Sequence, residues 1–307
     1  MSGFSKETTD LNALPELLAD VTASSETDKD IALSDAPKSR YETRFVGYID
    51  LLGFEQIVLK TSAEAYRQTQ SPEDRSKLLG QIVDALSIPK SDFAEECFSF
   101  LEEKYNSKNP LIKSRTFSDC VMFSAEHSER GLCVLLHSIF WVSRIMMRQG
   151  FYCRGAITSG EIYWSDDKEN HPIVFGPALN KAISLERKNA GIARVIFCNV
   201  SAKKLNEYRN QIDHNKLVNK LLDEHVSQST DGPWQVNFFS DFVDLDLSLQ
   251  VDKKDELTVL ADKLKTVMVE YTESPDVYRK LRAIAEQINA VAKKVGTEDA
   301  LIPLPEK

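Results

Sequence analysis

Two aspartates have sequence surroundings that fit a cation-binding site. Asp50 ends the apolar run 44–50, which predicts a buried strand. Asp119 lies between the β-rich runs 114–117 and 120–124, which predict a hairpin with this acid near its tip. A carboxylate at the end of a core strand is costly to bury unless it is paired or holds a cation. The alternative for Asp50 is a structural role as the N-cap of the next helix, because Asp is a favoured N-cap residue.

Two further residues extend this chemistry towards anions. Gly53 follows Asp50 within three residues, and a glycine there lets backbone N–H groups come close to an anion such as a phosphate. Arg154 lies in the predicted strand 151–163, between a cysteine and a glycine. A strand arginine in such a position is expected either to bind an anion or to form a structural salt bridge.

The elements around these residues alternate between strands and helices. Residues 54–106 have a helical pattern that Pro89 interrupts, and the strongly apolar helix 129–149 is expected to pack against a sheet. A helix over 176–189 and a strand over 193–198 follow. With the strand that ends at Asp50, the hairpin and the strand 151–163, this order predicts an α/β sandwich of the split βαβ, ferredoxin-like kind.

Three regions follow from composition and pattern. Residues 1–40 are rich in Ser and Thr without a sustained period, which indicates a mobile leader, and residues 41–200 carry the predicted sandwich. Residues 201–307 form an accessory region. Runs at 234–239 and 242–249 suggest a hairpin or two strands, one of them a candidate to extend the main sheet. Apolar positions at spacings of three and four predict a helical hairpin interrupted at Pro275.

Charge and cysteine usage exclude several functional classes. A net charge of −9 over 307 residues argues against binding to nucleic acid, which needs clustered Lys and Arg. No run of 18 apolar residues and no signal-peptide pattern occurs, so no membrane association is expected. The five cysteines form no CxxC pair and lie in apolar or strand-like runs. They indicate reduced core residues of a cytoplasmic protein.

Four short blocks in a fixed order carry a resemblance to a known family. They are Ile49–Phe54 (IDLLGF), Phe117–Asp119 (FSD), Arg154–Gly160 (RGAITSG) and Gly176–Asn180 (GPALN). Together they resemble the class III nucleotidyl cyclases, and more closely the bacterial pyrimidine cyclases of the Pycsar anti-phage system. The resemblance covers about residues 45–198.

The resemblance implies a metal and triphosphate site. Asp50 and Asp119, with the backbone carbonyl of Leu51, match the positions that hold two divalent cations, manganese or magnesium. Leu52, Gly53 and Phe54 match the backbone N–H groups that bind the triphosphate at a helix start. Arg154 falls six residues before Gly160, the spacing of the family's triphosphate-binding arginine.

The base pocket departs from the purine cyclases. Arg115 stands where those enzymes place a lysine, and Ile173 stands where they place an aspartate or a similar residue. Asn180 matches the family's ribose-orienting asparagine. Ser184 replaces the transition-state arginine, and Arg187, at i+7 from Asn180, is a candidate for the missing cation. The alternative is that Arg187 is an exposed surface residue paired with Glu186 or with solvent.

The resemblance therefore implies a homodimeric enzyme that converts UTP to 3′,5′-cyclic UMP and pyrophosphate. Cyclic UMP would act as a second messenger that a separate effector binds in anti-phage defence. UTP is preferred to CTP because Arg115 can only donate hydrogen bonds, and uracil offers two carbonyl acceptors where cytosine offers one. The alternatives are a cytidylate cyclase, an adenylate or guanylate cyclase, and an inactive cyclase fold that binds a nucleotide as a sensor.

Overall fold

The computed structural model of the chain describes residues 41–62, 71–87, 112–165, 173–210, 222–240, 242 and 253–305. The predicted leader, the break at Pro89, the fifth cysteine Cys97 and residues 243–249 of the second accessory strand lie outside the described residues.

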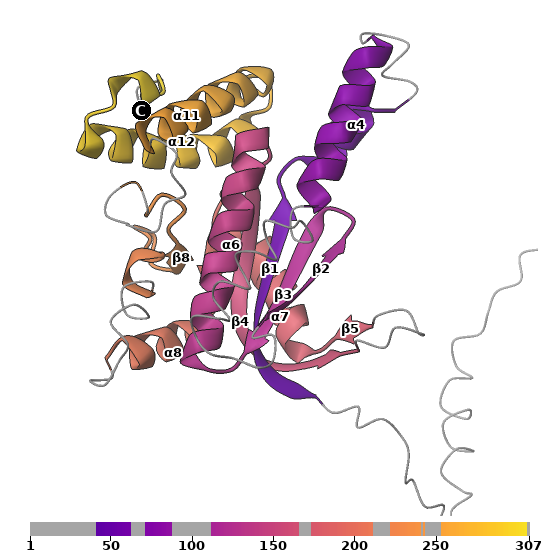
Figure 1. Cartoon of the computed structure of the whole chain (residues 1–307), viewed down its shortest axis with the longest axis vertical. Coiled ribbons are helices and arrows are strands. Elements are labelled where there is room, and N and C mark those ends of the chain that lie inside the picture. Colours follow the sequence, from indigo (N-terminus) through magenta and orange to yellow (C-terminus); the bar gives the residue numbers. More distant parts are fainter. Residues whose placement is uncertain are drawn as a thin grey trace, which may run out of the picture. The chain divides into compact units, whose positions relative to one another are not determined.

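The strand that ends near Asp50 is flanked by partners on both sides. It is β1 (Glu42–Leu51), which pairs antiparallel with β3 (Cys120–Glu126) and with β4 (Cys153–Trp164). The strand β2 (Ile112–Phe117) pairs antiparallel with β3, which gives the order β2-β3-β1-β4 (Figure 1). This is the order of a split βαβ unit, and the predicted mixed α/β architecture is confirmed.

The sheet continues beyond β4 into the accessory region. After α7 (Pro177–Leu185), β6 (Val195–Phe197) pairs parallel with β4, and β8 (Trp234–Val236) pairs antiparallel with β6. The strand β7 (Val226–Gln228) completes a hairpin with β8. An accessory strand therefore extends the main sheet, as predicted, and its hairpin partner precedes it in the chain. Two further elements are the short strand β5 (Val174–Phe175), which pairs with the end of β4, and the helix α8 (Asn199–Arg209).

The central helix α6 (Glu129–Gln149) has the predicted bounds and packs on one face of this sheet. The Ser128 hydroxyl caps its start by accepting the N–H of Gly131, and Gly150 ends it in a left-handed conformation. Gly47 of β1 lets the helix approach, because an added Cβ would lie 2.7 Å from the Ile139 Cδ1 atom. By length and composition α6 is apolar enough to cross a membrane, but 78% of its most apolar window is buried inside the protein.

The remaining helices surround the end of the sheet where β1 stops. They are α2 (Phe54–Lys60), α4 (Pro72–Ser87), α11 (Lys253–Glu270) and α12 (Pro275–Val295). The last two lie side by side, so the predicted C-terminal helix pair with Pro275 at its break is confirmed (Figure 1). A 3₁₀ turn at Glu298–Ala300 follows them.

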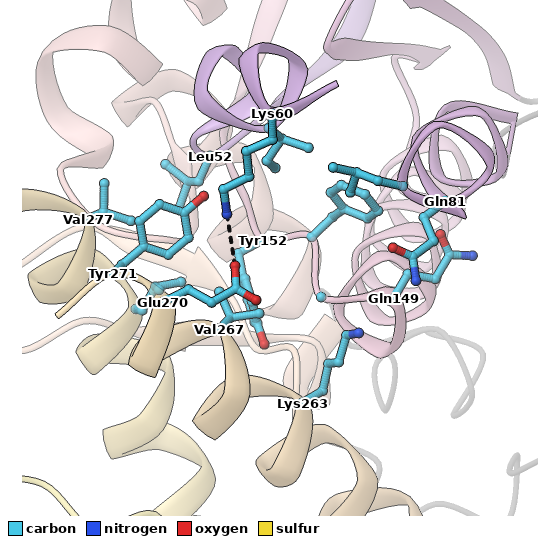
Figure 2. Close-up of a pocket in the computed structure, with 15 residues that line it drawn as sticks. Leu52, Lys60, Gln81, Gln149, Tyr152, Lys263, Val267, Glu270, Tyr271 and Val277 are labelled. Atoms are coloured by element: carbon cyan, nitrogen blue, oxygen red, sulfur yellow. Dashed lines mark hydrogen bonds and ion pairs between the residues drawn. The ribbon is translucent and has the colours of Figure 1, made fainter. Parts of the chain in front are cut away.

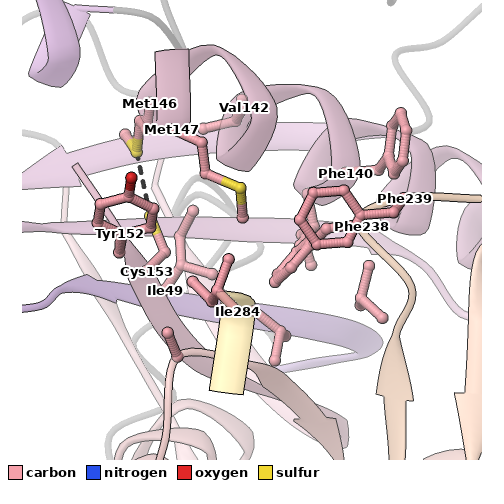
Figure 3. Packing of buried hydrophobic residues seen from close by; sticks show 14 of the residues in the cluster. Ile49, Phe140, Val142, Met146, Met147, Tyr152, Cys153, Phe238, Phe239 and Ile284 are labelled. Carbon is pink, nitrogen blue, oxygen red and sulfur yellow. Dashed lines mark hydrogen bonds between the residues drawn. The ribbon is translucent and has the colours of Figure 1, made fainter. Parts of the chain in front are cut away.

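One hydrophobic cluster joins the predicted sandwich to the accessory region. It contains Ile49 of β1, Met146 of α6 and Ile284 of α12, which Figure 3 shows close together. These residues lie in both predicted regions, 41–200 and 201–307. Burial of their shared surface stabilises the contact between α12 and the sheet, at roughly 25 cal/mol per Å² of apolar area.

The opposite face of the sheet carries the polar residues. Side chains alternate along β1, so Phe45 and Ile49 face α6 while Tyr48 and Asp50 face the other way. The helix α7 covers part of this second face through Ala182, which packs near Tyr48. The candidate site residues on β1 therefore lie on the face that α6 does not cover.

Two histidines, the partly buried His137 and the buried His225, hold α6 to the segment before β7. The indole N–H of Trp141 donates to His137 Nε2 at 2.8 Å, and His137 Nδ1 lies 3.2 Å from His225 Nε2. His225 Nδ1 lies 3.0 Å from the Ser240 hydroxyl. Because His137 Nε2 accepts a hydrogen bond, every hydrogen bond from Trp141 to Ser240 can form when both imidazole rings are neutral and carry their proton on Nδ1. Burial lowers the pKa of His137 to about 4 and that of His225, beside His137, to about 3.

This network predicts acid sensitivity. Between pH 6.5 and about 4 the unfolded histidines bind protons that the folded ones do not, so the free energy of unfolding falls as the pH falls, by up to about 1.4 kcal/mol per pH unit for each histidine. The variant His137→Gln keeps an acceptor for Trp141 and removes one titrating ring. Urea denaturation from pH 7 to 4.5 is expected to give a shallower decline for this variant than for wild type, and equal declines would contradict the account.

Candidate active site

The β-sheet register brings the two predicted metal-binding aspartates to the same end of the sheet. Asp50 lies opposite Cys120 of β3 and Arg154 of β4. Asp119 occupies the two-residue turn between β2 and β3, and its carbonyl accepts the N–H of Leu51 at 3.0 Å. The other turn residue, Ser118, has a φ of 49°, the left-handed conformation that such a tight hairpin requires. The predicted hairpin thus places Asp119 next to the end of β1.

The charge on Asp50 is only partly compensated in this arrangement. Its side chain is 17% exposed, and burial, followed by the nearby charge of Asp119, raises its pKa. The guanidinium groups of Arg154 and Arg187 act in the opposite direction without cancelling the increase. The site therefore carries an excess of negative charge that a cation would relieve.

Arg154 forms the ion pairs that the sequence left as one of two alternatives. Its Nη2 and Nε atoms lie 3.3 and 3.4 Å from Asp50 Oδ2. Its Nε atom also forms an ion pair with Glu186 Oε1. Arg154 is therefore shared between two carboxylates, one on β1 and one at the end of α7.

Glu186 was not predicted as a site residue. Its side chain is 2% exposed, and it begins a π-helical turn (Glu186–Ala190) that continues α7. Burial raises its pKa, and the charge of Arg154 lowers it. A signal was present in the sequence, because Ala178, Ala182 and Glu186 are spaced by four and share the buried face of the helix.

Asn180 and Arg187 occupy different surroundings. Arg187 is exposed, and its charge acts on Asp50 and Glu186 of its own chain. Asn180 is exposed on α7, and among the described residues its side chain makes no hydrogen bond to the Asp50 group. The predicted i+7 relation assumed a regular α-helix, whereas the π-helical turn widens the helix from residue 186 and changes the angular step.

One of the three backbone N–H groups predicted to bind the triphosphate is already hydrogen-bonded within the protein. Gly53 adopts a left-handed conformation (φ 72°, ψ 17°) immediately before α2, as expected for the glycine of a tight turn, and Phe54 begins the helix. The Leu52 N–H, however, donates to the Tyr152 carbonyl at 2.7 Å. Of the three predicted amides, those of Gly53 and Phe54 therefore stand at the helix start, while that of Leu52 joins β1 to the segment before Arg154.

Arg115, the predicted base-binding residue, lies on the same face of the sheet as Asp50. It pairs with Met122 of β3, which in turn pairs with Tyr48 of β1. Its guanidinium lies 5.0 Å from the ring centre of Trp164, at the end of β4. This stacking holds the arginine against an aromatic ring, which is a geometry that guanidinium groups favour.

The donor set at Asp50 and Asp119 fits a hard divalent cation. Magnesium and manganese prefer oxygen ligands, and magnesium is often held by one or two carboxylates with water and substrate phosphates supplying the rest. Among the described residues, no group of three or more His, Cys, Asp and Glu is placed to hold a metal ion. A cation at this site would accordingly depend on the two aspartates and on ligands from a bound phosphate.

Comparison with known proteins gives distant structural similarity. No model of a protein family matches the chain, and no curated protein matches it. The structure is similar to the adenylyl cyclase CyaB from P. aeruginosa (14% identity, TM-score 0.36, covering 68% of this chain and 98% of that one). It is also similar to the guanylyl cyclase Cya2 (13%, 0.35, 64% and 93%) and to a bacterial light-regulated adenylyl cyclase (13%, 0.38, 84% and 72%).

Repulsion between the aspartates predicts the effect of removing one charge. Because Asp119 raises the pKa of Asp50, Asp119→Asn should lower that pKa and increase the free energy of unfolding at pH 7 by on the order of 1 kcal/mol in metal-free buffer. Carboxyl ¹³C NMR titration of Asp50 and urea denaturation measure the two effects. The exposed Asp84→Asn on α4 is the matched control and should change neither. An unshifted Asp50 titration in Asp119→Asn would contradict the arrangement.

Proposed function

We propose that the protein is a uridylate cyclase that converts UTP to 3′,5′-cyclic UMP and pyrophosphate. The observation that carries this proposal is the pair of aspartates at the ends of β1 and the β2–β3 hairpin, where burial and then the nearby charge of Asp119 raise the pKa of Asp50. The four sequence blocks that resemble class III nucleotidyl cyclases support the same reaction, because two of them contribute these aspartates.

The proposed reaction needs positioning and charge rather than a protein nucleophile. The ribose O3′ attacks the α-phosphorus of the same nucleotide, the bond from that phosphorus to the bridging oxygen breaks, pyrophosphate leaves, and the hydroxyl proton passes to water. Two divalent cations, manganese or magnesium, would lower the pKa of the hydroxyl and neutralise the triphosphate. Asp50 and Asp119 would hold them, so the aspartates fix where the reacting atoms lie.

Arg154 is proposed to change partners when substrate binds. In the structure its guanidinium lies against Asp50 and Glu186. A triphosphate offers more negative charge than one carboxylate, and guanidinium groups bind phosphate oxygens well. Movement of Arg154 towards the triphosphate would free Asp50 for a cation, while Glu186 keeps the arginine near the site. Glu186 is then a positioning residue for Arg154.

The proposal also assigns Arg115 to the nucleotide base and Asn180 to a site shared with a second subunit. Arg115, stacked on Trp164, donates to a uracil carbonyl, and an amino group of cytosine at that position would leave two donors facing each other, which costs roughly 1–3 kcal/mol. Asn180 is exposed and makes no hydrogen bond to its own chain's Asp50 group among the described residues. We place it in the site of the other subunit of a homodimer, with the cyclic nucleotide acting on a separate effector in the cytoplasm.

The first test is product formation. Purified protein is incubated with manganese and, in separate reactions, with ATP, GTP, CTP or UTP. The UTP reaction should yield cyclic 3′,5′-UMP, and cyclic UMP should predominate in an equal mixture of UTP and CTP. Asp50→Ala and Asp119→Ala should each lower turnover by at least about a thousandfold, because each removes a cation ligand.

The exposed Asp84→Ala provides the control and should retain wild-type turnover. Predominant cyclic CMP would overturn the choice of UTP. Absence of any cyclic product from protein that binds UTP would identify the chain as an inactive nucleotide-binding protein. Near-wild-type turnover in either aspartate variant would contradict the assignment of the two metal ligands.

The second test addresses sharing of the site between subunits. Asp50→Ala and Asn180→Ala homodimers should both be inactive, whereas a heterodimer of the two contains one intact site and should recover up to about half of the wild-type rate. Differently tagged subunits allow the heterodimer to be purified and its composition verified. An inactive verified heterodimer, with both folds intact by circular dichroism, would place all site residues within one subunit.

A further inference from the structure

A cavity of about 110 Å³ lies behind the candidate active site, between α2, α4, the end of α6 and the pair α11 and α12 (Figure 2). Its walls are largely apolar and include Ile57, Phe151, Val267 and Leu281. A dry cavity of about 150 Å³ is known to hold a benzene molecule, so this smaller cavity suits no more than a single ring, and a substituent on that ring has to lie at the opening.

The polar groups of the cavity give it a net positive charge. Lys60 forms an ion pair with Glu270 at 2.9 Å and lies 5.3 Å from the ring centre of Tyr271. Lys263 also lines the cavity, and among the described residues it has no acidic partner. Figure 2 shows Tyr152 between the Lys60–Glu270 pair on one side and Lys263 with Gln149 on the other. The lining therefore contains two ammonium groups and one carboxylate, which gives the cavity one excess positive charge.

Two polar atoms of the lining residues are buried without a hydrogen-bond partner. The Tyr152 hydroxyl and the Gln149 Oε1 atom have no hydrogen-bond partner among the described residues. Both atoms are shielded from solvent, so they do not face the open space of the cavity, and Lys263 is the charged lining residue without an acidic partner among the described residues. Gly150 leaves room for Lys263, because an added Cβ at this glycine would lie 2.5 Å from the Lys263 Cε atom.

We propose that this cavity binds a small aromatic monocarboxylate, with its ring between the apolar walls and its carboxylate against Lys263. The negative charge matches the unpaired ammonium group, and the planar ring matches the volume. A neutral ring would lose the charge-assisted hydrogen bond, and a cationic ring would meet Lys263 as a like charge.

The cavity also touches the two segments that carry the candidate active site. Leu52 lines it, two residues after Asp50, and Tyr152 lines it, two residues before Arg154. The Leu52 N–H and the Tyr152 carbonyl are joined by a hydrogen bond of 2.7 Å. A ligand packed against both residues bears directly on the relative position of Asp50 and Arg154. On the proposed function, occupancy of the cavity regulates nucleotide turnover.

The binding test uses 4-fluorobenzoate as the probe, followed by ¹⁹F NMR, with 4-fluorobenzamide and 4-fluorobenzylamine as the neutral and cationic counterparts. For a ligand of this size we expect a dissociation constant of about 1 mM or tighter. Lys263→Met should weaken benzoate binding at least tenfold. The control Lys294→Met, exposed on α12 outside the cavity, should leave it unchanged.

Equal binding of the three probes, or equal benzoate binding in wild type and a folded Lys263→Met, would overturn the proposal. So would the absence of benzoate binding to wild type. Because ¹⁹F NMR detects binding without catalysis, it tests the ligand proposed for the cavity independently of the proposed cyclase activity. The regulatory step is tested by UTP turnover with manganese, which saturating 4-fluorobenzoate should change at least threefold in wild type but not in Lys263→Met. Unchanged turnover with confirmed binding would overturn the regulatory step alone.

Discussion

The placement of two aspartates at the same end of the sheet, where β1 stops, is the constraint on which the candidate site depends. Antiparallel pairing fixes Asp50 opposite Cys120, and the two-residue turn before Cys120 leaves Asp119 no position far from it. Burial and like charge then raise the pKa of Asp50. A fold that keeps this arrangement requires a compensating cation, and in the structure Arg154 supplies one.

Arg154 links this electrostatic constraint to the rest of the protein. It is held by Asp50 from β1 and by the buried Glu186 from the end of α7. Tyr152, two residues earlier in the chain, accepts the Leu52 N–H and faces the cavity below α11 and α12. The same short segment, 152–154, therefore contacts the candidate metal site on one side and the C-terminal helices on the other. A change in packing at α11 can reach the aspartates through this segment without a long chain of intermediates.

The sequence predicted the elements with strong local signals and missed those that depend on tertiary packing. The helix 129–149 and the hairpin with Asp119 at its turn were predicted closely, because apolar periodicity and turn chemistry are local. The burial of Glu186 and the π-helical turn that it begins could not be derived from helix propensity, since they follow from the packing of α7 on the sheet. The hydrogen bond from the Leu52 N–H to the Tyr152 carbonyl joins residues one hundred positions apart, and no local sequence pattern predicts it.

The central claim is that Asp50 and Asp119 jointly hold the cations that a nucleoside triphosphate brings to this site. Crystals grown with manganese and a non-cyclisable UTP analogue, with diffraction data collected at the manganese absorption edge, test it most directly. The account predicts anomalous peaks within coordination distance of both carboxylates and an Arg154 side chain that has left Asp50 for the triphosphate. Manganese bound elsewhere, or an intact Arg154–Asp50 pair beside a bound nucleotide, would contradict it.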